Sequence, residues 1–167
     1  MDERTLKARS GPALIGEAPT RGVRGAVSLE DTRICCMKVV VYSHDADTRA
    51  AMKLAIGSSP APDAPDAEII EVATSPALFR LLDAGGADVM VLDGEAQPAG
   101  GMGISRQAKD EIYNCPPVLL IIGRPDDRWL ATWSKADAVI SHPIDPVALA
   151  RELAALMRSR AAAVTAQ

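Results

Sequence analysis

The chain of 167 residues is long enough for one domain with a full hydrophobic core, and 48% of its residues are hydrophobic. Its formal net charge of −4 comes without a cluster of Lys and Arg, which argues against nucleic acid as a partner because phosphate neutralisation needs such a cluster. No apolar run is long enough to cross a bilayer, no secretory leader opens the chain, and three cysteines do not make a disulfide framework, so we expect a cytoplasmic protein without a membrane partner.

The first 36 residues differ in character from the rest. They mix Gly, Pro, Arg and small residues without a sustained period, which predicts a disordered leader. At Met37 the sequence changes abruptly to a β-branched run, so we expect Met37 to be the natural start, with a genuine disordered tail as the alternative. We place one domain at 37–160 and a short tail at 161–167.

Strand and helix signals then alternate along the first half of this domain. The β-branched run after Met37 predicts a buried strand. A Ser-Pro pair is typical of a helix start, and a glycine pair is typical of a helix end. In chain order we predict a strand at 38–42, a helix at 45–56, a loop at 58–67, a strand at 68–72 and a helix that runs from 75 to the glycines at 85–86.

The same alternation continues through the second half. We predict a strand at 87–93, a glycine-rich loop at 94–103, a helix at 104–114, a strand at 117–122, a short helix at 126–135, a strand at 137–141 and a helix at 145–158. Five apolar strands, each followed by a helix, predict an α/β fold: a three-layer (βα)5 sandwich with a five-stranded parallel sheet of the flavodoxin-like type. Functional residues of such sheets lie beyond the carboxyl ends of the strands.

Two segments at these strand ends carry a family resemblance. D-V-M-V-L-D at 88–93 is an apolar run that ends on a carboxylate, and S-H-P-I-D-P at 141–146 is a polar turn with proline that leads into a helix. With Pro98 and the five-fold alternation, they resemble the receiver domain of bacterial response regulators over residues 37–158. The resemblance implies that Asp93 is the phosphoacceptor, supported by Mg²⁺ that Asp93 and an acidic pair after the first strand would hold.

The residues that should support this chemistry are mostly different here. The receiver positions map as follows: the acidic pair on Ser43 and His44 with Asp45 just beyond, the Ser/Thr on Ile122, the Lys on His142 before Pro143, and the aromatic switch on Val139. Mg²⁺ prefers charged oxygen ligands, which Ser43 and His44 lack, so only Asp45 or Glu95 could help Asp93. We therefore predict a degenerate pocket that binds no cofactor and no metal. The family resemblance leaves Mg²⁺ as the one ion that the pocket could still bind.

The only two histidines of the chain both map to this pocket. With Asp93, His44 and His142 would supply a transition-metal set. A second hypothesis is that the two histidines only form hydrogen bonds, in a cleft that has no catalytic role. A third is a pH-responsive pocket in which protonated His142 pairs with Asp93. The loop at 94–103 is either a ligand-recognising loop or a tight connection that needs positive φ.

Two tryptophans suggest where a partner binds. Trp129 and Trp133 are four residues apart on the predicted helix at 126–135, hence on one face, and we expect at least one to be partly exposed. In receivers the fourth helix and fifth strand belong to the usual partner surface, so we predict a partner face of Trp129, Trp133 and Val139. Cys115, just before two prolines, is expected to pack at a helix end rather than to react.

Together these observations predict a signalling protein rather than an enzyme. We expect a stand-alone atypical response regulator that acts in phosphorelay-type signalling through protein contacts, without ordinary Mg²⁺-dependent phosphorylation. Its partner would be a sensor kinase, a downstream target or a second copy in a homodimer. Two alternatives stay open: a working receiver phosphorylated on Asp93 by a sensor histidine kinase, and a small flavodoxin-like ligand-binding protein or enzyme that uses the loop at 94–103.

Overall fold

The computed structural model describes residues 36–165, which form one sheet with helices between its strands. The elements are β1 (Met37–Tyr42), α1 (Ala46–Ile56), β2 (Ala67–Val72), α2 (Ser75–Asp83), β3 (Val89–Asp93), α3 (Gly101–Glu111), β4 (Val118–Ile122), the 3-10 turn η1 (Pro125–Asp127), α4 (Arg128–Trp133), β5 (Ala138–Ser141) and α5 (Pro146–Thr165). Within this range no helix has the length and apolar character to span a membrane. The predicted leader lies outside the described residues, except for Cys36.

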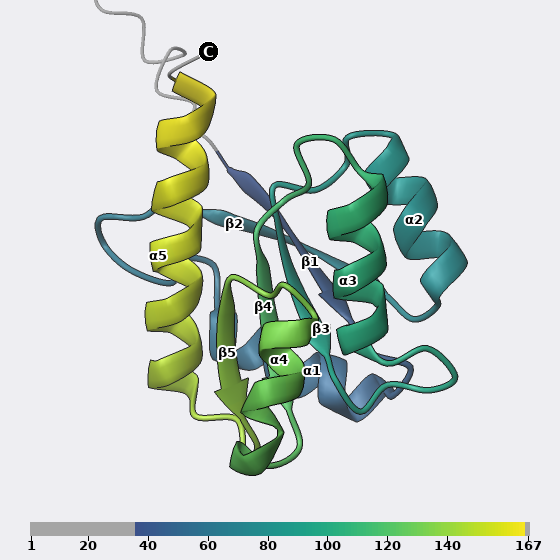
Figure 1. The fold of residues 1–167 in the computed structure, drawn as a ribbon. Coiled ribbons are helices and arrows are strands. Elements are labelled where there is room, and N and C mark those ends of the chain that lie inside the picture. Colours follow the sequence, from purple (N-terminus) through teal and green to yellow (C-terminus); the bar gives the residue numbers. More distant parts are fainter. Residues whose placement is uncertain (1–35, 166–167) are drawn as a thin grey trace, which may run out of the picture. The chain divides into compact units, whose positions relative to one another are not determined.

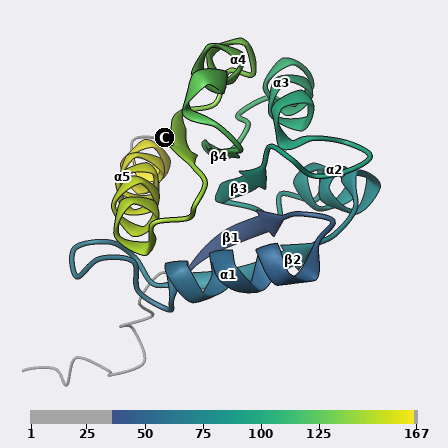
Figure 2. The same cartoon turned by 90° about the horizontal axis from the view of Figure 1, so that it is seen from below.

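The five strands are parallel and lie in the order β2-β1-β3-β4-β5. Helices cover both faces of the sheet, as the two perpendicular views show (Figures 1 and 2). The predicted three-layer (βα)5 sandwich is therefore confirmed. β3 lies between β1 and β4, so the carboxyl ends of these three strands meet at one edge of the sheet. This arrangement brings residues 43–45, 93–95 and 122–124 to the same edge.

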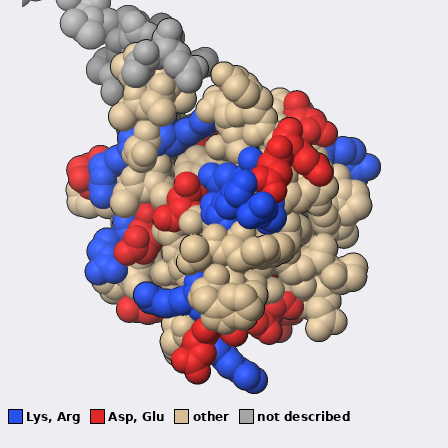
Figure 3. Space-filling view, viewed as in Figure 1, with Lys and Arg blue, Asp and Glu red and all other residues tan. Residues whose placement is uncertain are grey.

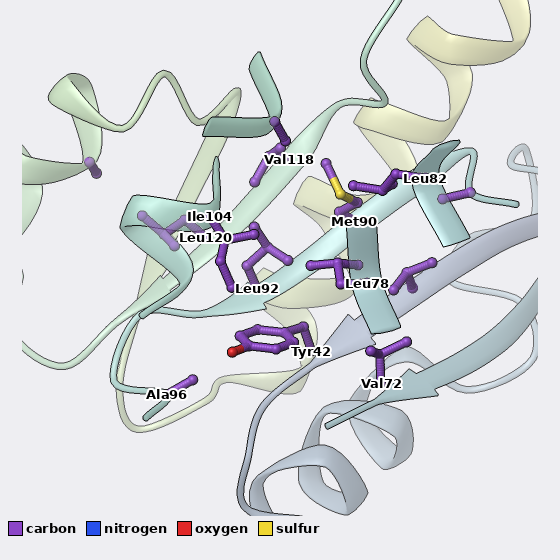
Figure 4. Packing of buried hydrophobic residues seen from close by; sticks show 14 of the residues in the cluster. Tyr42, Val72, Leu78, Leu82, Met90, Leu92, Ala96, Ile104, Val118 and Leu120 are labelled. Atoms are coloured by element: carbon purple, nitrogen blue, oxygen red, sulfur yellow. The ribbon is translucent and has the colours of Figure 1, made fainter. Parts of the chain in front are cut away.

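Alternating strand residues pack into two separate cores, one on each face. On one face Val39 and Val41 of β1 pack with α1 and α5. On the other face, Val40 and Tyr42 pack with helices α2, α3 and α4 (Figure 4). All five residues of β3 and all five of β4 are buried, because both of their faces are covered. The uninterrupted apolar sequence of these central strands follows from that burial.

Local signals explain the first turn of α1, which borders the site. Asp45 has extended backbone angles and its carboxylate accepts hydrogen bonds from the backbone N–H groups of Asp47 and Thr48. It is thus an N-cap, which satisfies N–H groups that have no partner within the helix. Gly57 ends the helix with a φ of 64°, a conformation that favours glycine.

Several predicted boundaries were wrong, among them the end of the helix predicted at 104–114, which ends at Glu111. α3 begins at Gly101, so the last part of the expected glycine-rich loop at 94–103 is helical. The last helix was predicted to stop at Arg158 before a tail, but α5 continues to Thr165 through an alanine-rich stretch that contains neither Gly nor Pro. The short helix predicted at 126–135 is divided into the 3-10 turn η1 and α4, which ends at Trp133.

Candidate functional site

The site is built around the carboxylate of Asp93, the last residue of β3. Its side chain is 3% exposed and lies at the edge where β1, β3 and β4 end. A buried carboxylate is costly unless it accepts hydrogen bonds or has a charged partner. Asp93 therefore needs local donors, and residues on both sides of it supply them.

Both oxygens of the Asp93 carboxylate accept a hydrogen bond. The hydroxyl of Ser43, which is fully buried, donates to Oδ2 over 2.7 Å. The backbone N–H of Glu95 donates to Oδ1 over 2.9 Å. Ser43 Oγ in turn accepts from the backbone N–H of Asp45 over 3.1 Å. Ser43 stands at the first position of the expected acidic pair. It contacts Asp93 directly, but as a neutral hydrogen-bond donor rather than as a second carboxylate.

The two carboxylates that could have assisted Asp93 are engaged elsewhere. Asp45 caps α1, and its hydrogen bonds from the hydroxyl and the backbone N–H of Thr48 hold the pKa of its carboxyl below the usual value. Glu95 is exposed, and its side chain lies over Gly123, where an added Cβ would come within 2.6 Å of Glu95 Oε1. Neither side chain has a hydrogen bond to Asp93 or Ser43 among the contacts of residues 36–165.

Side chains at the end of β1 form hydrogen bonds with the segment that follows Asp93. Tyr42 donates its hydroxyl hydrogen to the carbonyl oxygen of Ala99 over 2.8 Å. Nδ1 of His44 accepts a hydrogen bond from the backbone N–H of Gln97 over 3.1 Å. Three consecutive residues, with Ser43 between these two, therefore each contact Asp93 or the loop at 94–100. The role of Tyr42 could have been inferred, since a hydroxyl occurs at the last position of a buried strand.

The environment of Tyr42 also affects its ionisation. Burial raises the pKa of its phenol above the ordinary value of 10.0, and the nearby negative charge of Asp93 raises it further. The neutral phenol, which can donate to Ala99, is therefore favoured. Arg49, which sequence reasoning missed, donates from Nη1 to the carbonyl oxygen of Ser43 over 2.7 Å and fixes the turn after β1.

The remaining receiver positions form no hydrogen bond to the Asp93 carboxylate among the contacts of residues 36–165. Ile122 is fully buried in the core at the end of β4. The contact between His142 and Ile122 is a backbone hydrogen bond. The N–H of His142 donates to the carbonyl oxygen of Ile122 over 2.8 Å. His142 is one of the residues that line a cavity of about 490 Å³ between β5 and α5, together with Val139 and Pro143.

The two histidines line different cavities. His44 borders a cavity of about 460 Å³ with Thr74 at the start of α2 and Pro98 in the loop after β3. His142 is absent from its lining. Across residues 36–165, no three His, Cys, Asp or Glu side chains are grouped so that they could hold a metal ion. The hypothesis that His44, His142 and Asp93 form a transition-metal set is therefore not supported by their arrangement.

The tryptophans and Cys115 lie outside this site. Trp129 and Trp133 are 68% and 52% exposed, so the expectation that at least one is exposed is met by both. Cys115 packs against the core below α3, and burial raises the pKa of its thiol above the ordinary value. A raised thiol pKa disfavours the reactive thiolate, in keeping with a packing role.

Comparisons with known proteins agree with this architecture. No protein-family model matches the chain. It is 49% identical over 125 residues to a protein of Mycobacterium tuberculosis described as an uncharacterized response regulatory protein, found in strains H37Rv and CDC 1551; the match covers 75% of this chain and 94% of that protein.

Solved structures show the same fold at low sequence identity. The receiver domain of a Francisella response regulator is 15% identical with a TM-score of 0.62, over 74% of this chain and 98% of that one. A CheY-like receiver domain protein from Methanospirillum hungatei is 13% identical with a TM-score of 0.59, over 75% and 96% of the two chains. The signal receiver domain of a histidine kinase from Syntrophus aciditrophicus is 18% identical with a TM-score of 0.62, over 74% and 92%.

The sheet order and the aspartate at the end of β3 agree with the receiver fold, and the mycobacterial relative shares about half of its residues with this chain over nearly its whole length. The chain therefore belongs to the response-regulator family of two-component signalling proteins, and its fold is that of their receiver domain.

Proposed function

We propose that this protein is an atypical, single-domain response regulator that signals through protein contacts and does not use ordinary Mg²⁺-dependent phosphorylation. The observation that carries the proposal is the hydrogen bond from Ser43 to Asp93, at the place where a metal-holding carboxylate is expected. The match over 94% of the mycobacterial relative supports a protein made of one receiver domain. Receiver domains are in general signalling modules rather than enzymes, and we propose the same for this protein.

The donor set around Asp93 does not fit a magnesium ion. Mg²⁺ requires near-octahedral coordination by oxygen atoms, usually with help from one or two carboxylates. Among residues 36–165, the side chain that contacts the Asp93 carboxylate is the neutral hydroxyl of Ser43 rather than a second carboxylate. Asp45, two residues after Ser43, is held at the helix cap, and the side chain of Glu95 lies over Gly123. Without the ion, charge that develops on a transferred phosphoryl group has no divalent cation to neutralise it.

The residues that would sense a phosphoryl group are also changed. Ile122 has no hydroxyl, and its side chain is buried in the core that faces α3 and α4. His142 stands where a permanently charged lysine is expected, and it has no side-chain hydrogen bond to Asp93 among the contacts of residues 36–165. A phosphoryl group on Asp93 would thus lack both hydrogen-bond partners that link it to the partner surface. The hydroxyl of Ser43 is the side-chain hydrogen-bond partner that Asp93 has in this structure.

The retained carboxylate of Asp93 favours one alternative, a working receiver that a sensor histidine kinase phosphorylates. Asp93 lies at the end of β3 with its carboxylate at the sheet edge, the position that phosphoryl transfer requires. Such a protein would need a noncanonical source of positive charge for the transfer. Arg49 does not provide it directly, because its guanidinium is bound to the carbonyl oxygens of Ser43 and His44 and lies near Glu71.

Amide NMR spectra of the ¹⁵N-labelled chain distinguish the two. We expect that Mg²⁺ followed by beryllofluoride, a mimic of the phosphoryl group, leaves the resonances of Asp93, Ile122 and Val139 unchanged. Acetyl phosphate should likewise leave the intact mass unchanged. Shifts that spread from Asp93 to β4 and β5 on addition of both reagents would contradict the proposal and establish the working receiver.

A further inference from the structure

The first turn of α3 packs directly against Asp93. A Cβ added to Gly101 would lie 2.5 Å from the carbonyl oxygen of Asp93 and 3.0 Å from Cβ of Leu92, so no free space separates this turn from β3. The methyl carbon of Met102 would lie 3.5 Å from a Cβ added to Gly94, the residue after Asp93. Because closely packed groups transmit displacements to one another, a shift of the backbone at Asp93 also shifts the start of α3.

The middle of α3 is packed in the core. Ile104 and Ala108 are buried, and Ile104 lies beside Leu92 and Leu120 (Figure 4). A helix whose apolar face is packed in this way moves as one body rather than bending between its ends. A displacement at the first turn of α3 therefore reaches its last turns.

The second half of α3 forms hydrogen bonds with the end of α4. The hydroxyl of Ser105, which is fully buried, donates to the carbonyl oxygen of Ser134 over 2.9 Å. Nη1 of Arg106 donates to the carbonyl oxygen of Trp133 over 3.2 Å. The guanidinium of Arg106 also lies 5.8 Å from the ring centroid of Trp133, which is a cation–π distance. The position of the Trp133 indole thus depends on α3.

Ion pairs extend these contacts to the connection between α4 and β5. Asp110 pairs with Lys135, and Lys109 pairs with Asp137 over 2.7 Å. Figure 3 shows basic and acidic side chains next to each other over α3. Lys135 has a φ of 58°, which is unfavourable for a residue with a Cβ and persists only where the surroundings hold it. We call the contacts of Ser105, Arg106, Lys109 and Asp110 with residues 133–137 the α3–α4 cluster.

Other contacts of α4 are few. The helix has six residues, of which only Ala131 is buried. A helix of this length is not stable alone, so its position is set by its neighbours. Within residues 36–165, every side-chain hydrogen bond that joins residues 128–135 to another helix or strand comes from α3.

We infer that α3 transmits a change at Asp93 to α4 through the α3–α4 cluster, in place of a route through β4 and β5. Ile122 and Val139, at the receiver positions of those two strands, have aliphatic side chains without a hydrogen-bonding group. The inference rests on the proposed signalling through protein contacts, because Trp129 and Trp133 of α4 belong to the predicted partner face. Its test uses substitutions without Mg²⁺ or beryllofluoride, so a response to those reagents would contradict the proposed function and leave this route undecided.

The indole N–H of Trp133 reports on the cluster, because it gives its own resonance in ¹⁵N spectra. In the full chain with Trp129→Phe, Trp133 is the only tryptophan. Asp93→Asn keeps the shape of the side chain but leaves one acceptor oxygen for two donors, the hydroxyl of Ser43 and the backbone N–H of Glu95. One of these hydrogen bonds must change. We expect Asp93→Asn to shift the Trp133 indole resonance.

A second perturbation acts on α3 itself. Gly101→Ala displaces the first turn of the helix from β3 and should also shift the Trp133 resonance. Gly103→Ala is the matched control. A Cβ at Gly103 meets no atom within 4 Å, so this variant should leave the Trp133 resonance where it is in the parent protein.

Variants of the cluster test the route. Ser105→Ala removes the buried hydrogen bond to the end of α4, so the shift that Asp93→Asn causes at Trp133 should be lost. Asp110→Asn weakens the exposed ion pairs of α3 and is the second variant, for use if Ser105→Ala does not fold. Val139→Ala alters β5 and should retain the shift.

Three results would overturn the inference. The first is an unchanged Trp133 resonance in both Asp93→Asn and Gly101→Ala, with circular dichroism showing that both variants are folded. The second is a shift that persists in full in both variants of the cluster. The third is a shift that Val139→Ala abolishes, since the route would then run through β5.

Discussion

Ser43 Oγ and Asp93 Oδ2 are 2.7 Å apart, and this buried hydrogen bond joins the ends of β1 and β3. The hydroxyl satisfies one oxygen of a carboxylate that is almost fully buried, which would otherwise be costly. The same hydroxyl accepts from the N–H of Asp45 at the start of α1. One neutral side chain, that of Ser43, therefore connects Asp93 to the turn before α1. The family resemblance implies instead a metal ion held by several carboxylates at this place.

Ser43→Asp should restore a metal site. The substitution places a second carboxylate beside Asp93, which removes the hydroxyl donor and brings together two charged oxygen ligands. Two like charges at this distance repel each other, so a divalent cation that binds both becomes favourable. We expect Mg²⁺ or Mn²⁺ to bind this variant in about the millimolar range by calorimetry, and not to bind the wild type.

Ser43→Ala is the control for the metal experiment. It removes the hydrogen bond to Asp93 without adding a ligand, so it should not bind Mg²⁺. Binding by the wild type with the same affinity as Ser43→Asp would show that Asp93 holds the ion without a second carboxylate. The proposed loss of Mg²⁺-dependent chemistry would then be wrong.

His44 should hold the loop at 94–100 against the end of β1. Its Nδ1 accepts the hydrogen bond from the backbone N–H of Gln97 over 3.1 Å. A side chain without an acceptor at this position should therefore loosen the loop beside Asp93.

The amide resonance of Gln97 measures this effect. At one fixed pH, its hydrogen exchange should be faster in His44→Phe than in the wild type, because the phenyl ring offers no acceptor. In the control variant His142→Phe the Gln97 amide should exchange as in the wild type. Equal exchange in His44→Phe and the wild type would contradict the role of His44.

The fold was predictable because its signals are local and repeated. β3 and β4 are apolar throughout since helices cover both of their faces, and Asp93 ends the first of these runs. The start of α3 was missed because glycine has a low helix propensity, while packing places Gly101 against the Asp93 backbone. Side-chain directions at the strand ends were not predictable. His44 and His142 map to one family pocket, yet they line different cavities.

The phenol of Tyr42 should ionise at a pH above its ordinary pKa of 10.0, and its hydrogen bond should stabilise the folded protein at neutral pH. Tyr42→Phe removes the hydrogen bond to Ala99, which should lower the free energy of unfolding by about 1 kcal/mol in urea titrations. Because the folded-state pKa of the phenol is raised above 10.0, its contribution is complete below pH 10 and is lost as the pH rises through the folded value. In Tyr113→Phe, which leaves Tyr42 as the only tyrosine, ultraviolet absorbance should show tyrosinate forming above pH 10.0. Titration below that value would contradict the buried environment.

Two glycines of α3 should respond to alanine in opposite directions. A Cβ on Gly101 would lie 2.5 Å from the carbonyl oxygen of Asp93, so Gly101→Ala forces the helix away from β3 and should cost about 1–3 kcal/mol. A Cβ on Gly103 would meet no atom within 4 Å, so Gly103→Ala should stabilise the protein by up to about 1 kcal/mol through helix propensity. Urea unfolding measures both changes. Only Gly101→Ala should also shift the amide resonance of Glu95, which donates to Asp93. Equal effects of the two substitutions would mean that the close approach of α3 to Asp93 is absent in solution.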